Sequence, residues 1–148
     1  MAIMPDRIKF TVLGRAEPQG SIRAFMVRGK PRLTSDNAAM KPWRQEVGWC
    51  ALRALAKANA KQPWAAAKVP VRVTFHFYFA KPHSAPKRRQ WPSVKPDWDK
   101  LARSCGDAMT GIVWADDAQI VQATVVKEYG LPERAEITVE IVEDKGEN

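Results

Sequence analysis

The stretch that decides the fold is residues 69–79, VPVRVTFHFYF, in which apolar and polar side chains alternate. Valine or phenylalanine occupies every odd position, and the even positions after Pro70 carry Arg72, Thr74, His76 and Tyr78. Because successive side chains of a strand point to opposite faces, this period of two predicts a strand with one continuously apolar face. Such a strand is expected to lie centrally, over the core of a sheet. His76 then lies on the polar side, as a surface or packing residue.

Upstream of this strand the sequence predicts a strand, a hairpin and a helix. Ile8–Leu13 is expected to form the first strand, and Arg23–Thr34, with Gly29-Lys30-Pro31 in its middle, a short basic hairpin or extended arm. Asp36 or Asn37 can then cap a helix that continues to about Ala60. The apolar face of this helix is predicted from residues at helical spacing, namely Trp43, Val47, Cys50, Leu52 and Leu55.

Downstream, the sequence predicts a loop, a second helix and two strands. Residues 81–96 form a proline-rich basic loop, and Asp97 to about Thr110 a helix closed by a glycine. Ile120–Tyr129 and Ala135–Val142 alternate and are expected to pair as a terminal hairpin around Gly130 and Pro132. The fold class is therefore mixed α/β (α+β), a small mixed sheet with two main helices in the order β, hairpin, α, β, α, β, β. At 148 residues, positions 1–148 are expected to form one domain.

The basic residues are concentrated in two segments. The chain has a formal net charge of +8, and residues 15–44 hold seven Lys or Arg against two acids, while residues 81–95 hold five and no acid. Residues 128–148 reverse the balance, with seven acids against two basic residues. One positive face is the pattern of a protein that binds a polyanion such as nucleic acid. The candidate DNA-binding residues are Arg23, Arg28, Lys30, Arg32, Lys87, Arg88, Arg89, Lys95 and Lys100.

Several classes of protein are excluded by what the sequence lacks. No stretch approaches the roughly 18 apolar residues of a membrane helix, so the protein is expected to be soluble and cytoplasmic, without a membrane partner. Cys50 and Cys105 lie far apart, without metal-ligand spacing, and are expected to be reduced core residues. There is no phosphate-binding glycine loop, dinucleotide fingerprint or Gly-x-Ser-x-Gly elbow. Nucleotide cofactors and esterase chemistry therefore have no support.

Between Glu46 and Glu128 every acidic residue is an aspartate. Asp97 is expected near a helix cap and Asp99 in the first turn, where both have an ordinary structural explanation. Asp99, Arg103 and Asp107 are spaced by four on one helix stripe, which suggests that Asp107 pairs with Arg103. Asp116 and Asp117 follow a short turn, and they too have a structural alternative as turn residues.

These carboxylates would form a metal site if the next strand runs along the helix. Three or four of Asp97, Asp99, Asp116 and Asp117 would then converge. Oxygen ligands of this kind suit Mg²⁺, which in phosphoryl-transfer sites is held by a few carboxylates together with substrate phosphate. An acidic cluster beside a basic loop makes physical sense when a cation joins the two.

The acidic region resembles a known family. The run Asp97-Trp98-Asp99-Lys100-Leu101, then Asp107-Ala108, Gly111-Ile112, the segment 114–120 (WADDAQI) and Val126-Lys127 are similar to the signature of RusA-type Holliday-junction resolvases. The resemblance is dense from Asp97 to Lys127 and weaker elsewhere. It implies a compact homodimer that cuts branched DNA, the four-way junction, symmetrically with Mg²⁺, for which Mn²⁺ can substitute.

The resemblance also implies roles for individual residues. The family's catalytic carboxylates fall on Asp97, Asp99 and Asp117, and its basic residue, normally a lysine, falls on Arg103. The asparagine that usually follows the second aspartate is Lys100 here. Arginine keeps a charge for a phosphate but does not readily donate a proton. If the family's lysine acts as an acid, this chain would be impaired or would use Lys100 instead; if it acts electrostatically, Arg103 is sufficient.

Other features leave alternatives open. Trp91 and Trp98 could stack on an unpaired base or wedge a junction open, and Trp98 could equally be a core residue. Phe25 and Met26 could insert at the branch point or pack at a dimer interface, and His83 in the basic loop is expected to be a surface residue. The alternative functions are a non-catalytic DNA-binding or replication-accessory protein and a nuclease that prefers flaps or forks. Charge-neutralising Asp-to-Asn changes distinguish the non-catalytic DNA-binding protein from a nuclease. In the non-catalytic protein they would strengthen DNA binding, and there would be no cleavage for them to abolish.

Overall fold

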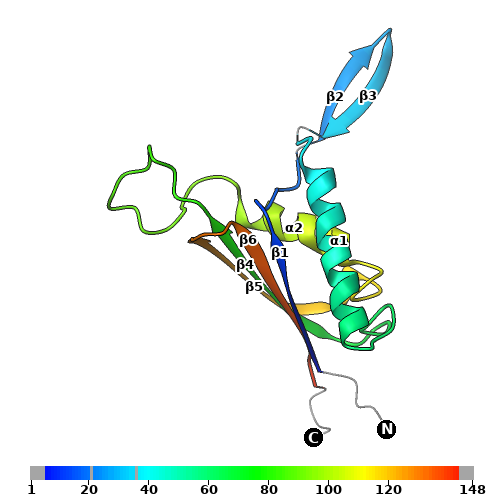
Figure 1. Ribbon diagram of the computed structural model, residues 1–148. Helices are drawn as coiled ribbons and strands as arrows, with labels where there is room; N and C mark the ends of the chain where they lie inside the picture. Colours follow the sequence, from blue (N-terminus) through cyan, green and yellow to red (C-terminus); the bar gives the residue numbers. More distant parts are fainter. Residues whose placement is uncertain (1–5, 21, 36, 144–148) are drawn as a thin grey trace, which may run out of the picture.

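The computed structural model describes residues 6–20, 22–35 and 37–143. They form a mixed α/β fold with two helices, a four-stranded mixed sheet and a separate hairpin (Figure 1). The elements are β1 (Arg7–Leu13), β2 (Ile22–Val27), β3 (Lys30–Ser35), α1 (Met40–Lys57), β4 (Val71–Phe79), α2 (Trp98–Met109), the 3₁₀ helix η1 (Asp117–Gln119), β5 (Ile120–Tyr129) and β6 (Arg134–Ile141).

Strand β4 is the central strand that the alternation in residues 69–79 predicts. Its odd-numbered side chains are buried and its even-numbered ones half-buried. It pairs with β5 on one side and β6 on the other, in the sheet order β1-β6-β4-β5. Because apolar side chains fill one of its faces along the whole strand, β4 anchors the core of the protein.

The predicted terminal hairpin of β5 and β6 is wrong, because β4 lies between these two strands. β5 runs parallel to β4, and β6 runs antiparallel to it. The physical reason is the crossover after β4. The chain passes through α2 and returns to the end of the sheet at which β4 begins, so β5 runs parallel to β4. The chain then turns at Gly130, whose N–H donates to the Phe79 carbonyl at 2.9 Å, and comes back on the far side of β4.

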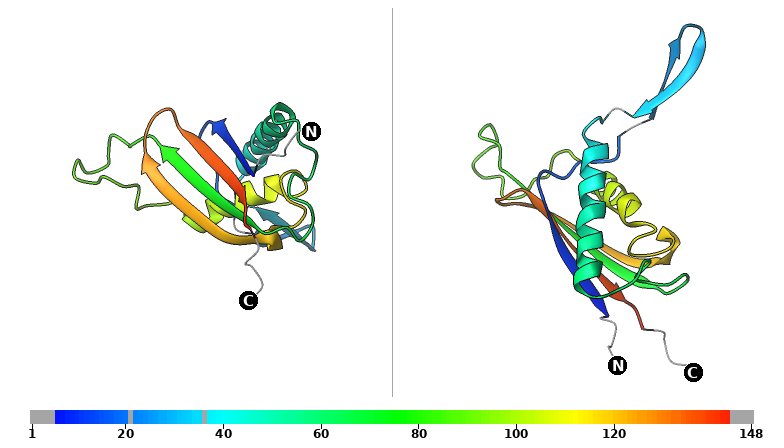
Figure 2. Two further views of the ribbon diagram at one scale, coloured as in Figure 1. Left: turned by 90° about the horizontal axis from the view of Figure 1, so that it is seen from below. Right: turned by 45° about the vertical axis from the view of Figure 1, so that its right-hand side comes forward.

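Both helices pack on one face of the sheet and against each other (Figure 2). The predicted apolar face of α1 is borne out for Trp43, Val47 and Leu55, whereas Cys50 and Leu52 are only half-buried. Helix α1 begins at Met40 with Ala39 as its N-cap and without a side-chain capping hydrogen bond, so the predicted cap at Asn37 is wrong. The Asn37 side chain instead accepts a hydrogen bond from the Ala39 N–H, before the helix, at 3.1 Å. Asp36 lies outside the described residues.

The two cysteines are free thiols in different surroundings. Cys105 is fully buried in the core, where burial raises the pKa of its thiol to about 12. Cys50 is half-buried, and desolvation raises its pKa, assisted by Glu46, to which its thiol donates at 3.7 Å. Their predicted place in the core is therefore confirmed for Cys105 and only in part for Cys50.

The opposite face of the sheet is polar and holds three of the acidic residues of the C-terminal region. Glu128, Glu136 and Glu140 point to this face, and each lies beside a basic partner. His76 is 2.6 Å from Glu128 and stacks on Tyr78, in keeping with the packing role expected for it. Within the described ranges, no helix is long and apolar enough to cross a membrane.

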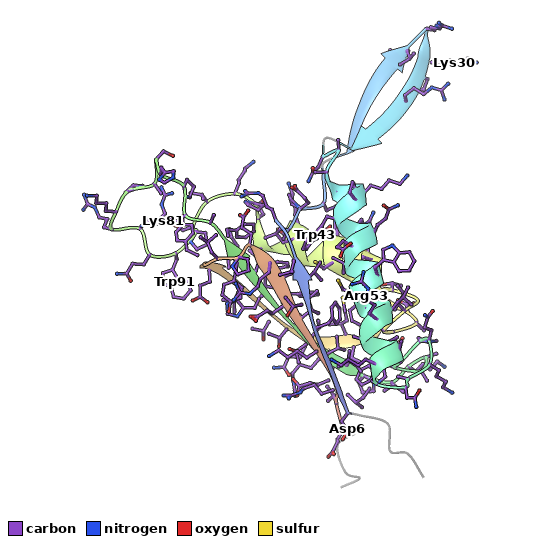
Figure 3. All side chains as sticks on the ribbon, in the orientation of Figure 1. Asp6, Lys30, Trp43, Arg53, Lys81 and Trp91 are labelled. Atoms are coloured by element: carbon purple, nitrogen blue, oxygen red, sulfur yellow. The ribbon has the colours of Figure 1, made fainter. Side chains whose placement is uncertain are left out.

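Two basic segments project from one end of this body. The β2–β3 hairpin extends beyond α1, and residues 81–96, the basic loop, extend beyond the end of β4 (Figure 1). Lys30 on the hairpin and Lys81 and Trp91 on the loop lie far from Asp6, which marks the opposite end of the sheet (Figure 3). Helix α2 begins between the two projections, so the predicted acidic residues at its N-terminus lie between two basic surfaces.

Candidate nuclease site

Asp97 and Asp99 occupy the start of α2, as the sequence predicts. Asp97 is the N-cap residue, with extended backbone angles (φ −69°, ψ 141°), and its carbonyl accepts from the Leu101 N–H at 3.1 Å. Its carboxylate makes no capping hydrogen bond to the described N–H groups of the helix, and both aspartates are exposed. The side-chain capping role that would explain Asp97 structurally is therefore not realised. The two carboxylates remain open to a ligand.

The two carboxylates line one hollow, here called the acidic hollow, with a volume of about 370 Å³. Lysines lie on two sides of it, Lys95 at the end of the basic loop and Lys127 on β5. Asp97 also borders a neighbouring hollow of about 430 Å³ that contains Lys100 and Arg15. The neighbouring hollow also contains Glu17, so Asp97 and Asp99 lie among several cations and one further acid. Two adjacent carboxylates beside lysines suit a cation held against a phosphate backbone. The full lining of the acidic hollow is Ser93, Val94, Lys95, Asp97, Trp98, Asp99 and Lys127.

Lys127 is a site residue that the sequence reasoning named only within the family signature. Its ammonium donates to the carbonyls of Val94 at 2.6 Å and of Pro96 at 2.7 Å. Partial burial lowers the pKa of this ammonium, and the charge of Asp97 opposes the shift. The feature that marks Lys127 is its position: it pairs with Phe77, on the face of the sheet that packs on the helices. A lysine on that face breaks the alternation and needs partners.

Asp117 lies in a different hollow, beside Arg103 and Asp107. This hollow has a volume of about 230 Å³ and is bounded by α2, the start of β5 and the side chains of Val73 and Phe75. In the described part of the chain, no group of three or more His, Cys, Asp or Glu side chains is placed to hold a metal ion. The turn after α2 is short, so the start of β5 meets the second half of that helix. Arg103 lies about 6 Å along the helix axis from Asp99, at 1.5 Å per residue.

Asp116 caps the 3₁₀ helix η1, which matches its expected structural alternative as a turn residue. One oxygen of its carboxylate accepts from the Ala118 N–H at 2.9 Å. Gln119 completes the capping box, because its side-chain carbonyl accepts from the N–H groups of Ala115 and Asp116, both at 2.9 Å. Sequence reasoning missed Gln119 as a capping residue, although a glutamine three positions after an aspartate is the capping-box pattern.

Gln119 also ties the acidic turn to the segment that precedes β4. Its side-chain amide donates to the carbonyls of Ala66 at 2.8 Å and Val69 at 2.9 Å. The side chain is buried, with 6% of its surface exposed. Its oxygen therefore fixes the backbone of Ala115 and Asp116, and its amide N–H groups tie this turn to the segment before β4.

The predicted pairing of Asp107 with Arg103 is wrong. Asp107 instead accepts a hydrogen bond from the guanidinium of Arg44 on α1 at 2.5 Å. The reason is the packing of α1 on α2, which brings a basic residue from a distant part of the sequence onto the stripe of α2 that carries Asp107. Asp107 therefore joins the two helices, while Arg103 remains exposed beside Asp117.

The predicted DNA-binding residues lie on both projections and at the start of α2. Arg28, Lys30 and Arg32 are exposed around the hairpin turn, where Arg28 and Gly29 both have positive φ (51° and 75°). Positive φ at both turn positions is characteristic of a type I′ hairpin turn. Arg23 lies on β2, but its side chain is outside the described residues. The others are exposed (Lys87, Arg88, Lys95) or half-buried (Arg89, Lys100).

The aromatic side chains near the site are exposed. Trp98 exposes 61% of its surface at the rim of the acidic hollow, so it is not a core residue. Trp91 exposes 56% in the basic loop, and Met26 exposes 66% on the hairpin. His83 is also exposed, as expected, and the side chain of Phe25 lies outside the described residues.

Comparison with known proteins agrees with the resemblance in the acidic region. The model of a protein family described as Endodeoxyribonuclease RusA matches residues 16–140. The chain is also 29% identical over 144 residues to the uncharacterized protein YqaN of Bacillus subtilis (strain 168), an alignment that covers 90% of this chain and 96% of YqaN. The family match includes both basic projections, the two hollows that hold Asp97, Asp99 and Asp117, and three strands of the sheet, β4 and β5 in whole and β6 in part; β1 lies before it.

Proposed function

Because this chain belongs to the RusA endodeoxyribonuclease family, we propose that it is a Mg²⁺-dependent endonuclease that resolves four-way DNA junctions by phosphodiester hydrolysis in recombination and repair. The observation that carries the proposal is the pair Asp97 and Asp99. Their carboxylates are exposed and share one hollow, and the surface around that hollow is basic. A protein that only bound DNA would gain nothing from carboxylates at this position.

The donor set of the acidic hollow fits Mg²⁺. This ion is usually held by one or two carboxylates together with substrate phosphate and water, and so does not require a cage of protein ligands. Asp97 and Asp99 provide two such carboxylates. Asp116, which the sequence also suggests as a ligand, is not among the residues that line this hollow, and one of its oxygens caps η1. Bound there, the cation supplies positive charge that stabilises the developing charge on the scissile phosphate.

The chain's own cations account for DNA binding. Arg28, Lys30 and Arg32 on the hairpin and the lysines and arginines of the basic loop lie on either side of the start of α2. A branched DNA spanning both projections would place a phosphate near Lys95 at the acidic hollow. These contacts orient the backbone, and so position a phosphodiester beside Asp97 and Asp99.

Asp117 and Arg103 form the second part of the proposed machinery. They share a hollow about one helical turn from the acidic hollow. Arg103 provides a permanent guanidinium charge for a phosphate oxygen, and Asp117 orients that guanidinium or supplies a further oxygen ligand. Electrostatic stabilisation is a role that arginine can perform in place of the family's lysine.

The active form in this proposal is a homodimer. Resolving a junction requires two strands to be cut, and each chain offers one acidic hollow among its described residues. A twofold axis would present two such hollows symmetrically to the two halves of a four-way junction.

The decisive experiment measures cleavage of a synthetic four-way junction, a flap, a replication fork and a linear duplex of the same sequence. We expect cleavage of the junction, dependence on Mg²⁺ or Mn²⁺, and complete loss of cleavage in excess EDTA. Asp97→Asn and Asp99→Asn should each abolish cleavage and leave binding intact or tighter, since each removes one negative charge next to the DNA. Asp107→Asn is the matched control, because it makes the same chemical change on the same helix at the ion pair with Arg44.

Each alternative outcome is informative. Preferred cutting of flaps or forks would retain the nuclease and reject the junction as its substrate. Tight DNA binding without cleavage in any metal would favour the non-catalytic DNA-binding protein. Normal cutting by both Asp97→Asn and Asp99→Asn would reject the acidic hollow as the catalytic site.

A further inference from the structure

The acidic pair follows a long segment without regular secondary structure. Between the end of β4 at Phe79 and the start of α2 at Trp98, residues 80–97 contain no helix or strand. Loops of this length are uncommon in compact proteins and are often functional. Asp97 is the last residue of this segment, so its position depends on what fixes the residues immediately before it.

One side chain fixes that end of the loop. The ammonium of Lys127 donates to the carbonyls of Val94 at 2.6 Å and Pro96 at 2.7 Å, which lie on either side of Lys95. Lys127 belongs to β5 and lies opposite Phe77 of the central strand. The two hydrogen bonds therefore join the residues just before Asp97 to β5, at the position paired with the buried Phe77.

Lys127 also borders the site itself. It lines the acidic hollow together with Asp97 and Asp99. An ammonium has three N–H donors, and two of them are used by the loop carbonyls. The charge of Lys127 is consequently held at a fixed place beside the two carboxylates.

We infer that Lys127 is a positioning residue of the nuclease, which holds residues 94–97 against β5 and thereby sets where the Asp97 and Asp99 carboxylates meet the cation and phosphate. This inference rests on the proposed function. Residues that orient metal ligands influence how well those ligands hold the metal. Removing such a residue typically costs roughly 10–100-fold in metal affinity or activity.

The test replaces Lys127 with methionine, which keeps an unbranched side chain, one atom shorter, and removes both hydrogen bonds. Amide hydrogen exchange is measured by mass spectrometry over residues 93–99, and the single-turnover rate and the dissociation constant are measured on a four-way junction. We expect faster exchange over residues 93–99 and a single-turnover rate lower by roughly 10–100-fold. The matched control is Lys9→Met, which removes the same charge from an exposed position on β1. Junction affinity should be the same in the two variants.

Exchange over α1 shows whether the fold is retained. If Lys127→Met also speeds amide exchange over α1, Lys127→Arg is measured in its place. Arginine retains a cation with several N–H donors, so exchange over residues 93–99 should return towards that of the parent protein. Exchange in Lys127→Met equal to that of Lys9→Met would overturn the inference, and so would faster exchange with an unchanged cleavage rate. A parent protein that cuts no junction would reject the proposed function alone, because the exchange measurement still tests whether Lys127 holds the loop.

Discussion

The guanidinium of Arg44 on α1 donates a hydrogen bond to the carboxylate of Asp107 on α2 at 2.5 Å. Both side chains are about one-third exposed, so solvent screens the pair. This contact takes Asp107 out of the set of aspartates available for chemistry and gives it a structural role.

The first prediction is that Asp107→Asn lowers stability slightly and leaves junction cleavage intact. Partly exposed ion pairs contribute about 1 kcal/mol or less to the free energy of unfolding. Urea denaturation of Asp107→Asn, Arg44→Ala and the double variant would measure the coupling between the two residues. A loss of cleavage comparable to that of Asp97→Asn, in a folded Asp107→Asn protein, would contradict the structural role.

The second prediction separates the two neighbouring aspartates of the acidic turn. Asp117→Asn should abolish cleavage, whereas Asp116→Asn should be milder, because asparagine keeps the oxygen that accepts from the Ala118 N–H. Asp116→Ala should lower the free energy of unfolding by roughly 0.5–2 kcal/mol through loss of the cap. Cleavage gels and thermal unfolding on the same preparations give both readouts. Equal activity in Asp116→Asn and Asp117→Asn would show that the pair does not divide its roles in this way.

The sequence predicts the secondary structure well where a pattern is local. The alternation in residues 69–79 specifies β4, because every second side chain must enter the core. The spacing of Leu101 and Cys105 identifies the buried face of α2 in the same way. The exposed positions of Asp97 and Asp99 follow from that face, so this half of the site could be predicted from the sequence.

What the sequence does not reveal is set by packing between distant segments. The short link from Tyr129 to Arg134 reads as a hairpin turn, yet β4 is inserted between the two strands it joins. The place of Asp117 depends on which half of α2 meets the start of β5, and that is decided by the length of the intervening turn. Lys127 was overlooked as a positioning residue because its partners are backbone carbonyls of the basic loop, which no side-chain pattern encodes.

The third prediction concerns Arg103, which replaces the lysine usual in the family. If Arg103 stabilises charge in the transition state, Arg103→Ala should lower the cleavage rate by about 10²–10³-fold, as removal of a single stabilising donor does in other enzymes. Affinity for the junction should fall much less. Arg103→Lys, which retains a positive charge, should recover part of the rate. Single-turnover kinetics separate these effects, and a loss of affinity at an unchanged rate would show that Arg103 only binds a phosphate.

The fourth prediction is a homodimer in solution. Sedimentation at micromolar concentration should give twice the mass of the chain, 16.6 kDa. On a plasmid that extrudes a cruciform, mixed dimers of the parent and Asp97→Asn should produce nicked circles, because only one of the two hollows can cut. The parent alone should produce linear plasmid. A monomer with full resolving activity would rule out the symmetric mechanism.

The last prediction uses salt to ask which basic surface meets the DNA. The logarithm of the binding constant falls with the logarithm of salt concentration, with a slope of about −0.9 for each phosphate neutralised on duplex DNA. Replacing Arg28, Lys30 and Arg32 together by alanine should reduce the steepness of this slope by up to about three units on a four-way junction, since all three lie exposed at the hairpin turn. A triple alanine variant at Lys9, Lys57 and Lys61 is the control; it removes the same charge from exposed positions off both projections. Fluorescence anisotropy between 50 and about 200 mM salt covers the range in which such contacts change affinity most. Equal slopes for the two triple variants would mean that the hairpin attracts DNA only through net charge, and that the junction is held by the basic loop.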